Sequence, residues 1–189
     1  ELRDRVYEVI EKNHFKPNSL AQGLITKKTN TIGIIVPDIS NAVFGKLTKG
    51  INSVFAKEGY TVVLCESQGE IEKELKLLGI LEEKQIEGLL FAGVDVNHTL
   101  VESMRKRNYP VVLVTQEASE DEEAVHTVIH NNVEAMYDAV KFLLDNGHER
   151  IAYLGGPKND FSSGKKRVIG YKKALEEAVI GVKDSYIVQ

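Results

Sequence analysis

The sequence predicts an α/β protein in which a doubly wound parallel sheet carries helices on both faces. After residue 30, short runs rich in Val and Ile alternate with longer segments whose apolar residues recur at helical spacing. The short runs are almost continuously apolar, as expected of strands buried on both faces. Strands that alternate with helices in this way are typical of parallel sheets.

Each expected element lies between recognisable boundaries. We expect strands at 31–36, 61–65, 88–92, 111–114, 125–129 and 151–154, and a last strand near Tyr186. Amphipathic helices are expected from Asn41, from Ile71, around Met104, from Ala135 and around Tyr171. Gly59 and Gly147 end two of these helices, because glycine readily adopts the left-handed conformation found at helix C-termini.

A different pattern precedes the first strand. Apolar residues recur at helical spacing from Leu2 to Ile10, and Asn18 can cap a very short helix over 19–24. Residues 1–30 hold six Lys and Arg against four acidic residues, a net charge of +2, so the remainder of this chain of net charge −4 carries −6. This division permits a nucleic-acid contact at the leading end only, although a solvated charged surface explains it equally well.

The composition excludes several classes of protein. The only cysteine of the 189 residues is Cys65, which excludes a disulfide framework and a multi-cysteine metal site. No apolar run approaches the roughly 20 residues of a membrane span. The first residues do not have the basic and then apolar character of a secretory signal, so we expect a cytoplasmic protein with no membrane partner.

The residues that carry common enzyme chemistry are missing from the sequence. Neither a nucleotide P-loop nor a dinucleotide fingerprint follows the first strand, and Cys65 has no evident base partner. His126 and His130 share one face, but no further metal ligand accompanies them. We therefore expect no enzyme activity, no cofactor and no metal site.

Ligands of open α/β sheets bind beyond the carboxyl ends of the strands. In this chain the segments at that edge are 38–44, 93–95, 115–116 and 161–167. They predict a common rim, to which Asp95 and Phe161 belong.

A series of motifs runs along the whole chain in one register: Phe15–Leu24, Lys27–Asn41, Gly59–Tyr60, Glu87–Leu90, Pro110–Val114, Asn146–His148, Arg150–Ala152, Gly155–Pro157 and Arg167–Tyr171. Together they resemble the lactose-repressor (LacI/GalR) family of bacterial transcription regulators. The stretches 27–41 and 170–188 are similar to the catabolite control proteins, one branch of this family.

The resemblance implies a domain organisation. Residues 1–30 would be the end of a DNA-binding headpiece and a hinge helix, and 31–147 the first lobe of an effector-binding core. Residues 148–189 would begin a second lobe, in a fold like that of type I periplasmic binding proteins. We expect the chain to be a piece of a regulator of roughly 330 to 340 residues.

The resemblance also implies how DNA is bound. Hinge helices of a homodimer would enter the minor groove of operator DNA, where Leu24 would wedge a base step and kink the duplex. Without the resemblance, Leu24 would be interpreted as the apolar anchor of a short helix. Gly23 lowers the stability of this helix by up to about 1 kcal/mol relative to alanine. The implied hinge contacts are Asn18, Ser19, Ala21, Gln22, Leu24, Lys27 and Lys28.

The effector site carries over residue by residue. Phe44 would form an aromatic wall, with Val43, Asp38 and Asn41 at the same rim. Arg167 would grip a pair of sugar hydroxyls or a purine, a role that suits a planar, forked donor. Without the resemblance, Arg167 would be interpreted as a solvated helix charge. Further pocket positions are Gln116 and Ser163.

Two departures from the family pattern bear on the ligand. Thr115 and Gln116 replace a frequent Asp-Arg pair, and His130 stands where an aspartate is usual. These departures do not select one ligand. The resemblance as a whole implies a sugar, a sugar phosphate or a purine as effector.

The expected function is a transcriptional regulator, a repressor, whose effector closes the two lobes and alters operator binding by the dimer. The resemblance to catabolite control proteins adds a phosphocarrier protein as corepressor. The alternative is a solute-binding protein of a transport system, which predicts a signal peptide and no hinge. An enzyme on the same sheet predicts converging acid, base or nucleophile groups.

Overall fold

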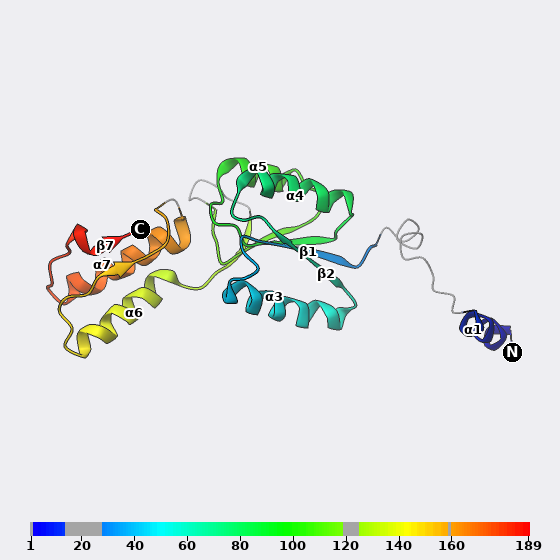
Figure 1. Ribbon diagram of the computed structural model, residues 1–189, viewed down its shortest axis with the longest axis horizontal. Helices are drawn as coiled ribbons and strands as arrows, with labels where there is room; N and C mark the ends of the chain where they lie inside the picture. The colour runs from blue at the N-terminus through cyan, green and yellow to red at the C-terminus, as the bar shows by residue number, and fades with distance from the viewer. Residues whose placement is uncertain (1, 14–27, 119–124, 159) are drawn as a thin grey trace.

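The computed structural model of the chain describes residues 2–13, 28–118, 125–158 and 160–189 (Figure 1). Its larger sheet is parallel throughout, with the strand order β2-β1-β3-β4-β5. The strands are β1 (Thr31–Val36), β2 (Thr61–Glu66), β3 (Gly88–Phe91), β4 (Val111–Val114) and β5 (His126–Val128). The expected parallel α/β fold is confirmed, and the order reverses between β1 and β3, the kind of position where doubly wound sheets collect ligands.

Helices cover both faces of this sheet (Figure 1). One face carries α3 (Ala42–Phe55), which a short turn, η1 (Ala56–Glu58), extends; the other carries α4 (Ile71–Glu83) and α5 (His98–Arg105). Because successive side chains of a strand point to opposite faces, Ile35 packs in the cluster with α4 and α5. Its neighbours Ile34 and Val36 pack with Phe44 and Leu47 of α3.

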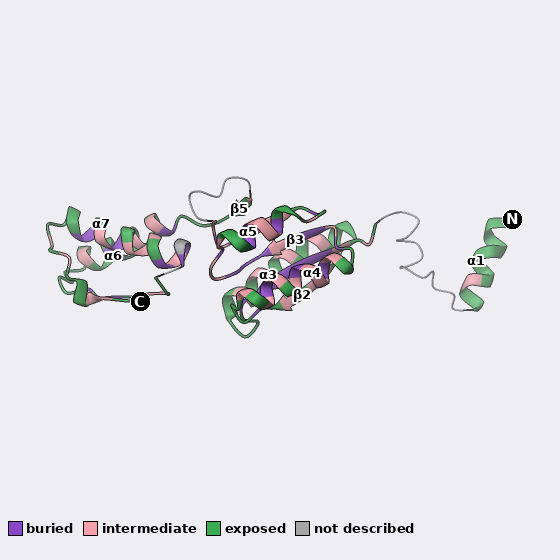
Figure 2. Cartoon of the chain, turned by 90° about the horizontal axis from the view of Figure 1, so that it is seen from above, coloured by how far each residue is buried: buried purple, intermediate pink, exposed green. Residues whose placement is uncertain are grey.

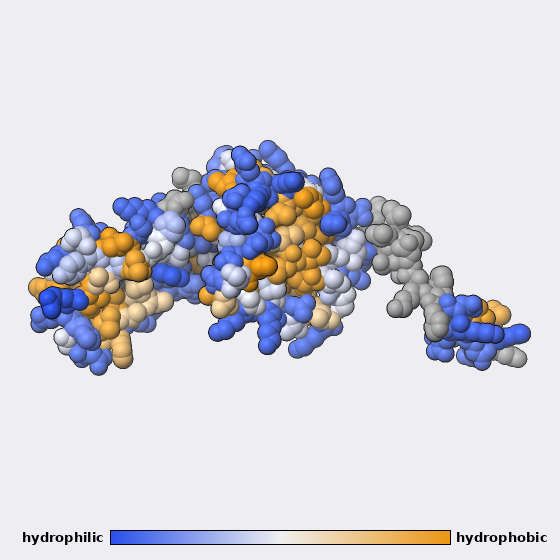
Figure 3. All heavy atoms as spheres, viewed as in Figure 1, coloured by the Kyte–Doolittle hydropathy of each residue, from blue (hydrophilic) through white to orange (hydrophobic). Residues whose placement is uncertain are grey.

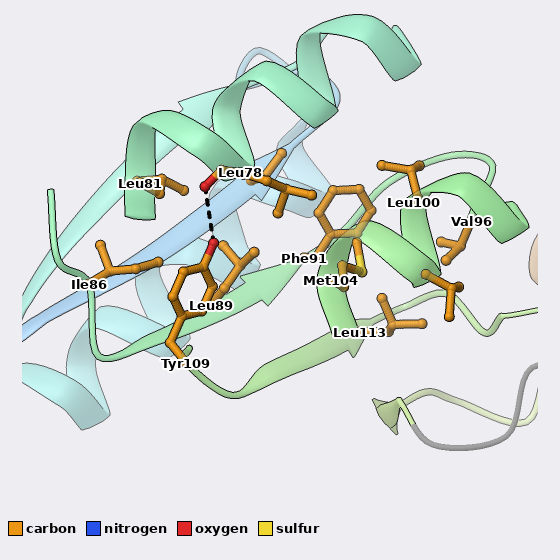
Figure 4. Packing of buried hydrophobic residues seen from close by; sticks show 12 residues of the cluster. Leu78, Leu81, Ile86, Leu89, Phe91, Val96, Leu100, Met104, Tyr109 and Leu113 are labelled. Atoms are coloured by element: carbon orange, nitrogen blue, oxygen red, sulfur yellow. Dashed lines mark hydrogen bonds between the residues drawn. The ribbon is translucent and has the colours of Figure 1, made fainter. Parts of the chain in front are cut away.

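The main hydrophobic core lies between the sheet and the α4–α5 layer (Figure 4). Leu78 of α4, Leu100 of α5 and Phe91 of β3 are each fully buried there. The Tyr109 hydroxyl enters the same core and donates to the Leu78 carbonyl oxygen at 3.1 Å. Burial raises the pKa of Tyr109 to about 12, so its hydroxyl remains a donor at any physiological pH.

A second unit follows β5. It contains α6 (Asn132–Asp145), β6 (Tyr153–Leu154), η2 (Phe161–Lys165), α7 (Lys166–Glu177), η3 (Asp184–Tyr186) and β7 (Ile187–Val188). β6 and β7 form a small parallel sheet, and buried residues recur along α6 and α7 (Figure 2). Val140 of α6 packs with Tyr153, Tyr171 and Leu175, in a cluster separate from the two on the larger sheet.

The packing of α6 bears on where the expected first lobe, 31–147, ends. Val140, Met136 and Leu144 face the second cluster, and none of them joins the clusters on the five-stranded sheet. The amphipathic spacing of α6 correctly predicts a buried face but carries no information about its partner. We propose that the boundary between the two units lies between β5 and α6.

The leading helix, α1 (Leu2–Lys12), forms where the apolar spacing predicts it. It buries none of its residues in the described part of the chain. The expected hinge helix, 19–24, lies outside the described residues.

The close approach of α6 and α7 depends on Gly170. A Cβ at this position would lie 2.1 Å from the Val133 carbonyl oxygen and 3.0 Å from the Tyr137 backbone nitrogen. Gly170→Ala should therefore lower the free energy of unfolding by about 2 kcal/mol or more, measured by urea unfolding followed by circular dichroism.

Gly50→Ala is the matched control, since nothing lies within 4 Å of a Cβ at that position of α3. It should stabilise the chain by up to about 1 kcal/mol through helix propensity. Equal effects of the two substitutions would contradict a packing role for Gly170.

Candidate functional site

Polar residues gather where β1 ends, beside the point at which the strand order reverses. The Asp38 carboxylate accepts hydrogen bonds from the Ser40 hydroxyl and the Ser40 N–H, each at 2.7 Å, and these bonds lower its pKa. Asn41 caps α3, because its Oδ1 accepts from the Val43 N–H at 2.9 Å. Asp38 and Asn41 thus shape the turn that leads into α3, and both side chains stay exposed.

The two apolar members of the expected rim have different surroundings. Val43 is 60% exposed in the first turn of α3. Phe44 is partly buried against Ile34, Val36 and Ala92, so at least part of its ring covers the core. Phe44 is therefore anchored by the sheet, whereas Val43 is available to solvent.

A buried carboxyl lies at the ends of β2 and β3. Glu74 of α4 is 1% exposed, and its Oε1 accepts from the Ser67 hydroxyl at 3.2 Å. Burial raises the pKa of Glu74, and the nearby charge of Asp95 raises it further, against the opposing effect of the Ser67 bond. A Cβ at Gly93 would lie 3.2 Å from the same Oε1, so this carboxyl supports the loops on which Asp95 lies.

The end of β4 meets the start of the second unit through a second buried carboxylate. Asp160 is 4% exposed and caps η2, accepting from the Ser163 N–H at 2.7 Å and from the Ser163 hydroxyl. The Gln116 side-chain amide donates to Asp160 at 3.5 Å. The structure therefore brings together Gln116 and Ser163, two residues that the sequence analysis assigned to one site.

Two further contacts cross the same boundary. The Glu117 N–H donates to the fully buried Ser162 hydroxyl at 2.8 Å, and the Lys166 ammonium pairs with the Glu117 carboxylate. These polar contacts hold the residues after β4 against the first turns of η2 and α7.

Arg167 lies in the first turn of α7 beside the start of α6. Its Nε donates to Asn132 Oδ1 at 2.9 Å, and its Nη2 lies 3.4 Å from His130 Nε2. The Nε bond fixes one edge of the guanidinium, and its two terminal amino groups lie on the opposite edge. His130, a departure from the family pattern, is thus a neighbour of Arg167.

Asn132 is a site residue that the sequence analysis missed. It is 2% exposed, and its Nδ2 is buried without a hydrogen-bond partner among the described residues. A buried donor without an acceptor is costly in a folded protein.

The remaining expected site residues are only partly placed. The hydrogen bonds of Arg167 and the packing contacts of Phe44 involve different groups. Asp95 is half-buried, and Phe161 opens η2, but its side chain is outside the described part. Of the expected hinge contacts, Lys28 is described and exposed; Asn18, Ser19, Ala21, Gln22, Leu24 and Lys27 lie outside the described residues.

Two general searches bear on other functions. Across the described ranges, no group of three or more His, Cys, Asp or Glu side chains could hold a metal ion. No helix in the same ranges is long and apolar enough to cross a bilayer.

Comparison with known proteins supplies a family and relatives. Residues 29–189 match the family model described as periplasmic binding proteins and sugar binding domain of LacI family. Catabolite control protein A of Priestia megaterium is 38% identical, over 99% of this chain and 56% of the relative. The transcriptional repressor PurR of Aliivibrio salmonicida is 32% identical, over 92% of this chain and 52% of the relative.

Solved structures agree with this result. The transcription regulator CcpA of Lactococcus lactis superposes with a TM-score of 0.76 at 31% identity, covering 84% of this chain and 57% of that one. The regulator CelR, solved with cellobiose, superposes with a TM-score of 0.75 at 22% identity, covering 98% of this chain and 55% of that one. The chain thus spans about half the length of the curated relatives that it matches.

The buried Glu74 makes stability depend on pH. Because its pKa is raised in the folded state, the wild-type chain gains stability as pH falls through the folded pKa towards the ordinary value of 4.5. At neutral pH the charged carboxylate opposes folding, so Glu74→Gln should raise the free energy of unfolding at pH 7. The advantage of the variant should disappear below pH 4.5.

Urea unfolding at pH 4 and pH 7 measures this difference. Glu72→Gln, an exposed position on the same helix, is the control and should show no such pH-dependent gain. A Glu74→Gln chain that is less stable than wild type at pH 7 would contradict the assignment.

Proposed function

The chain belongs to the LacI family, and from this premise we propose that it is part of a DNA-binding transcriptional repressor whose core binds a small effector. The main support for the proposed effector site is the hydrogen bond between Arg167 and Asn132. Asn132 holds the guanidinium by its Nε, and the Asn132 amide nitrogen lacks an acceptor in the described part of the chain. A ligand with oxygen acceptors would bond to the guanidinium that Asn132 holds in place.

The chemistry of this pair favours a polar, oxygen-rich or nitrogen-rich ligand. A forked guanidinium bonds in two places to neighbouring hydroxyls or to the edge of a base. His130 adds an imidazole nitrogen beside the guanidinium. We therefore keep a sugar, a sugar phosphate or a purine as the class of effector.

We assign the other side of the site to residues at the strand ends of the larger sheet. Phe44 offers an aromatic surface held by the core, and Gln116 and Ser163 meet around Asp160. The complete proposed set is Asp38, Asn41, Val43, Phe44, Asp95, Gln116, Phe161, Ser163 and Arg167, and we add Asn132 and His130 because both contact Arg167.

The DNA-binding part of the proposal concerns the leading segment. Residues 19–24 would form hinge helices that pair in a homodimer and enter the minor groove, with Leu24 as the wedge. The similarity to transcriptional repressors over nearly the whole chain supports this role. It favours a regulator over a transport protein of the same fold.

An apolar surface supports the proposed homodimer. Figure 3 shows it over β2 and the neighbouring sheet, between α3 and α4. Val54 of α3 is 61% exposed and Leu64 of β2 is 42% exposed. Contiguous apolar surface of this kind is typical of protein–protein interfaces.

Substitution of Arg167 tests the effector site. A charged hydrogen-bond partner contributes about 1.5 to 3 kcal/mol, so Arg167→Ala should weaken binding of the best ligand roughly tenfold or more. Titration calorimetry on the full-length regulator, with a panel of sugars, sugar phosphates and purines, measures the affinity. Arg167→Lys should recover only part of the loss, because an ammonium lacks the fork.

Arg105→Ala is the matched control, since it removes an arginine of α5 that pairs with Glu102. It should bind the ligand as wild type does. If Arg167→Ala binds the best ligand as tightly as wild type, the assignment of Arg167 is wrong.

A further inference from the structure

The opposite end of the five-stranded sheet carries a carboxylate with an unusual set of partners. Glu87 directly precedes β3, and its Oε1 accepts from the backbone N–H groups of Thr29 and Asn30, each at 2.7 Å. The other oxygen, Oε2, accepts from the Tyr60 hydroxyl at 3.2 Å. One side chain thus binds two successive amides of the segment that leads from the hinge into β1.

The same short segment is held by the backbone around it. The Thr29 hydroxyl donates to the Gln85 carbonyl oxygen at 2.6 Å, and the Thr61 N–H donates to the Asn30 carbonyl oxygen at 2.7 Å. Asn30 has a φ of +48°, in the left-handed region, so the chain turns sharply just before β1. Without the Glu87 bonds, the N–H groups of Thr29 and Asn30 would lose their acceptor.

Tyr60 connects this arrangement to the end of the α3 layer. Its ring packs edge-on against Phe55, the last residue of α3, with centroids 5.8 Å apart and an interplanar angle of 77°. Donation to a carboxylate raises the pKa of Tyr60. The pKa of Glu87 is lowered, because the two backbone amides, Tyr60 and the charge of Lys28 together outweigh the effect of burial.

We infer that Glu87 is a positioning residue for DNA binding: it fixes the path on which residues 28–30 leave the sheet, and so the direction in which the hinge is presented. This inference rests on the proposed function. Two strong bonds to adjacent amides restrict rotation at the turn, whereas a single contact would leave the segment free to swing. Charge-assisted bonds of this kind are about twice as strong as neutral ones.

Amide hydrogen exchange tests the local restraint without any DNA. In the full-length chain, Glu87→Ala should raise the exchange rates of the Thr29 and Asn30 amides about tenfold or more, while the amides of β1 and β3 keep their protection. Glu87→Gln keeps an oxygen acceptor without the charge and should lie between wild type and Glu87→Ala. Glu83→Ala, an exposed acid at the end of α4, is the control and should change neither amide.

DNA affinity tests the functional consequence. The probe is a duplex selected by the wild-type full-length regulator from a random-sequence pool. Glu87→Ala should bind it about tenfold more weakly, with partial rescue in Glu87→Gln and with no change in effector affinity or melting temperature beyond that of the control.

Three outcomes would contradict the account in different places. Unchanged exchange of both amides in Glu87→Ala would overturn the restraint itself. Faster exchange with unchanged DNA affinity would overturn the positioning role. If the wild-type full-length regulator selects no duplex, the proposed function fails and the positioning role fails with it. The exchange result still decides whether Glu87 restrains the segment.

Discussion

The buried carboxylate of Asp160 is the group on which the candidate site depends. A carboxylate at this depth must be satisfied by donors, and here those donors come from both sides of the boundary between the two units. By capping η2, Asp160 sets where α7 begins and therefore where Arg167 lies. By accepting from Gln116, Asp160 connects the start of α7 to the end of β4. The need to satisfy buried Asp160 thus fixes the positions of Gln116, Ser163 and Arg167 relative to one another.

Much of the fold could be predicted from the sequence because its signals are local. The strands 31–36 and 111–114 match their predicted bounds, since each is a continuous apolar run with a clear stop. The placement of α6 could not be predicted in this way. Its apolar face requires a partner, but α7 becomes that partner only through the close approach at Gly170.

The candidate site could be predicted only in outline. The rule for carboxyl strand ends and the family pattern both lead to Arg167 and Gln116, because those positions are fixed by topology. Asn132 and Asp160 were missed, since a buried polar residue looks like a surface one in a single sequence. Glu74 did leave a signal: it shares a helical face with Leu78 and Leu81, where a charge is out of place.

The two ends of the larger sheet have different roles in the proposed function. The carboxyl ends of its strands would contribute to the proposed effector site, and the opposite end holds residues 28–30, which lead to the proposed hinge. Both ends rely on carboxylates that accept from several donors, Asp160 at one and Glu87 at the other. Under the proposed function, effector binding and DNA binding would therefore use separate residues.

The most direct test of this division is to measure both affinities in the full-length regulator after Leu24→Ala. Binding to a duplex selected from a random-sequence pool should weaken, because the proposed wedge is lost. Affinity for the best sugar, sugar phosphate or purine should stay that of wild type. An equal loss of effector affinity, or DNA binding as tight as wild type, would contradict the account.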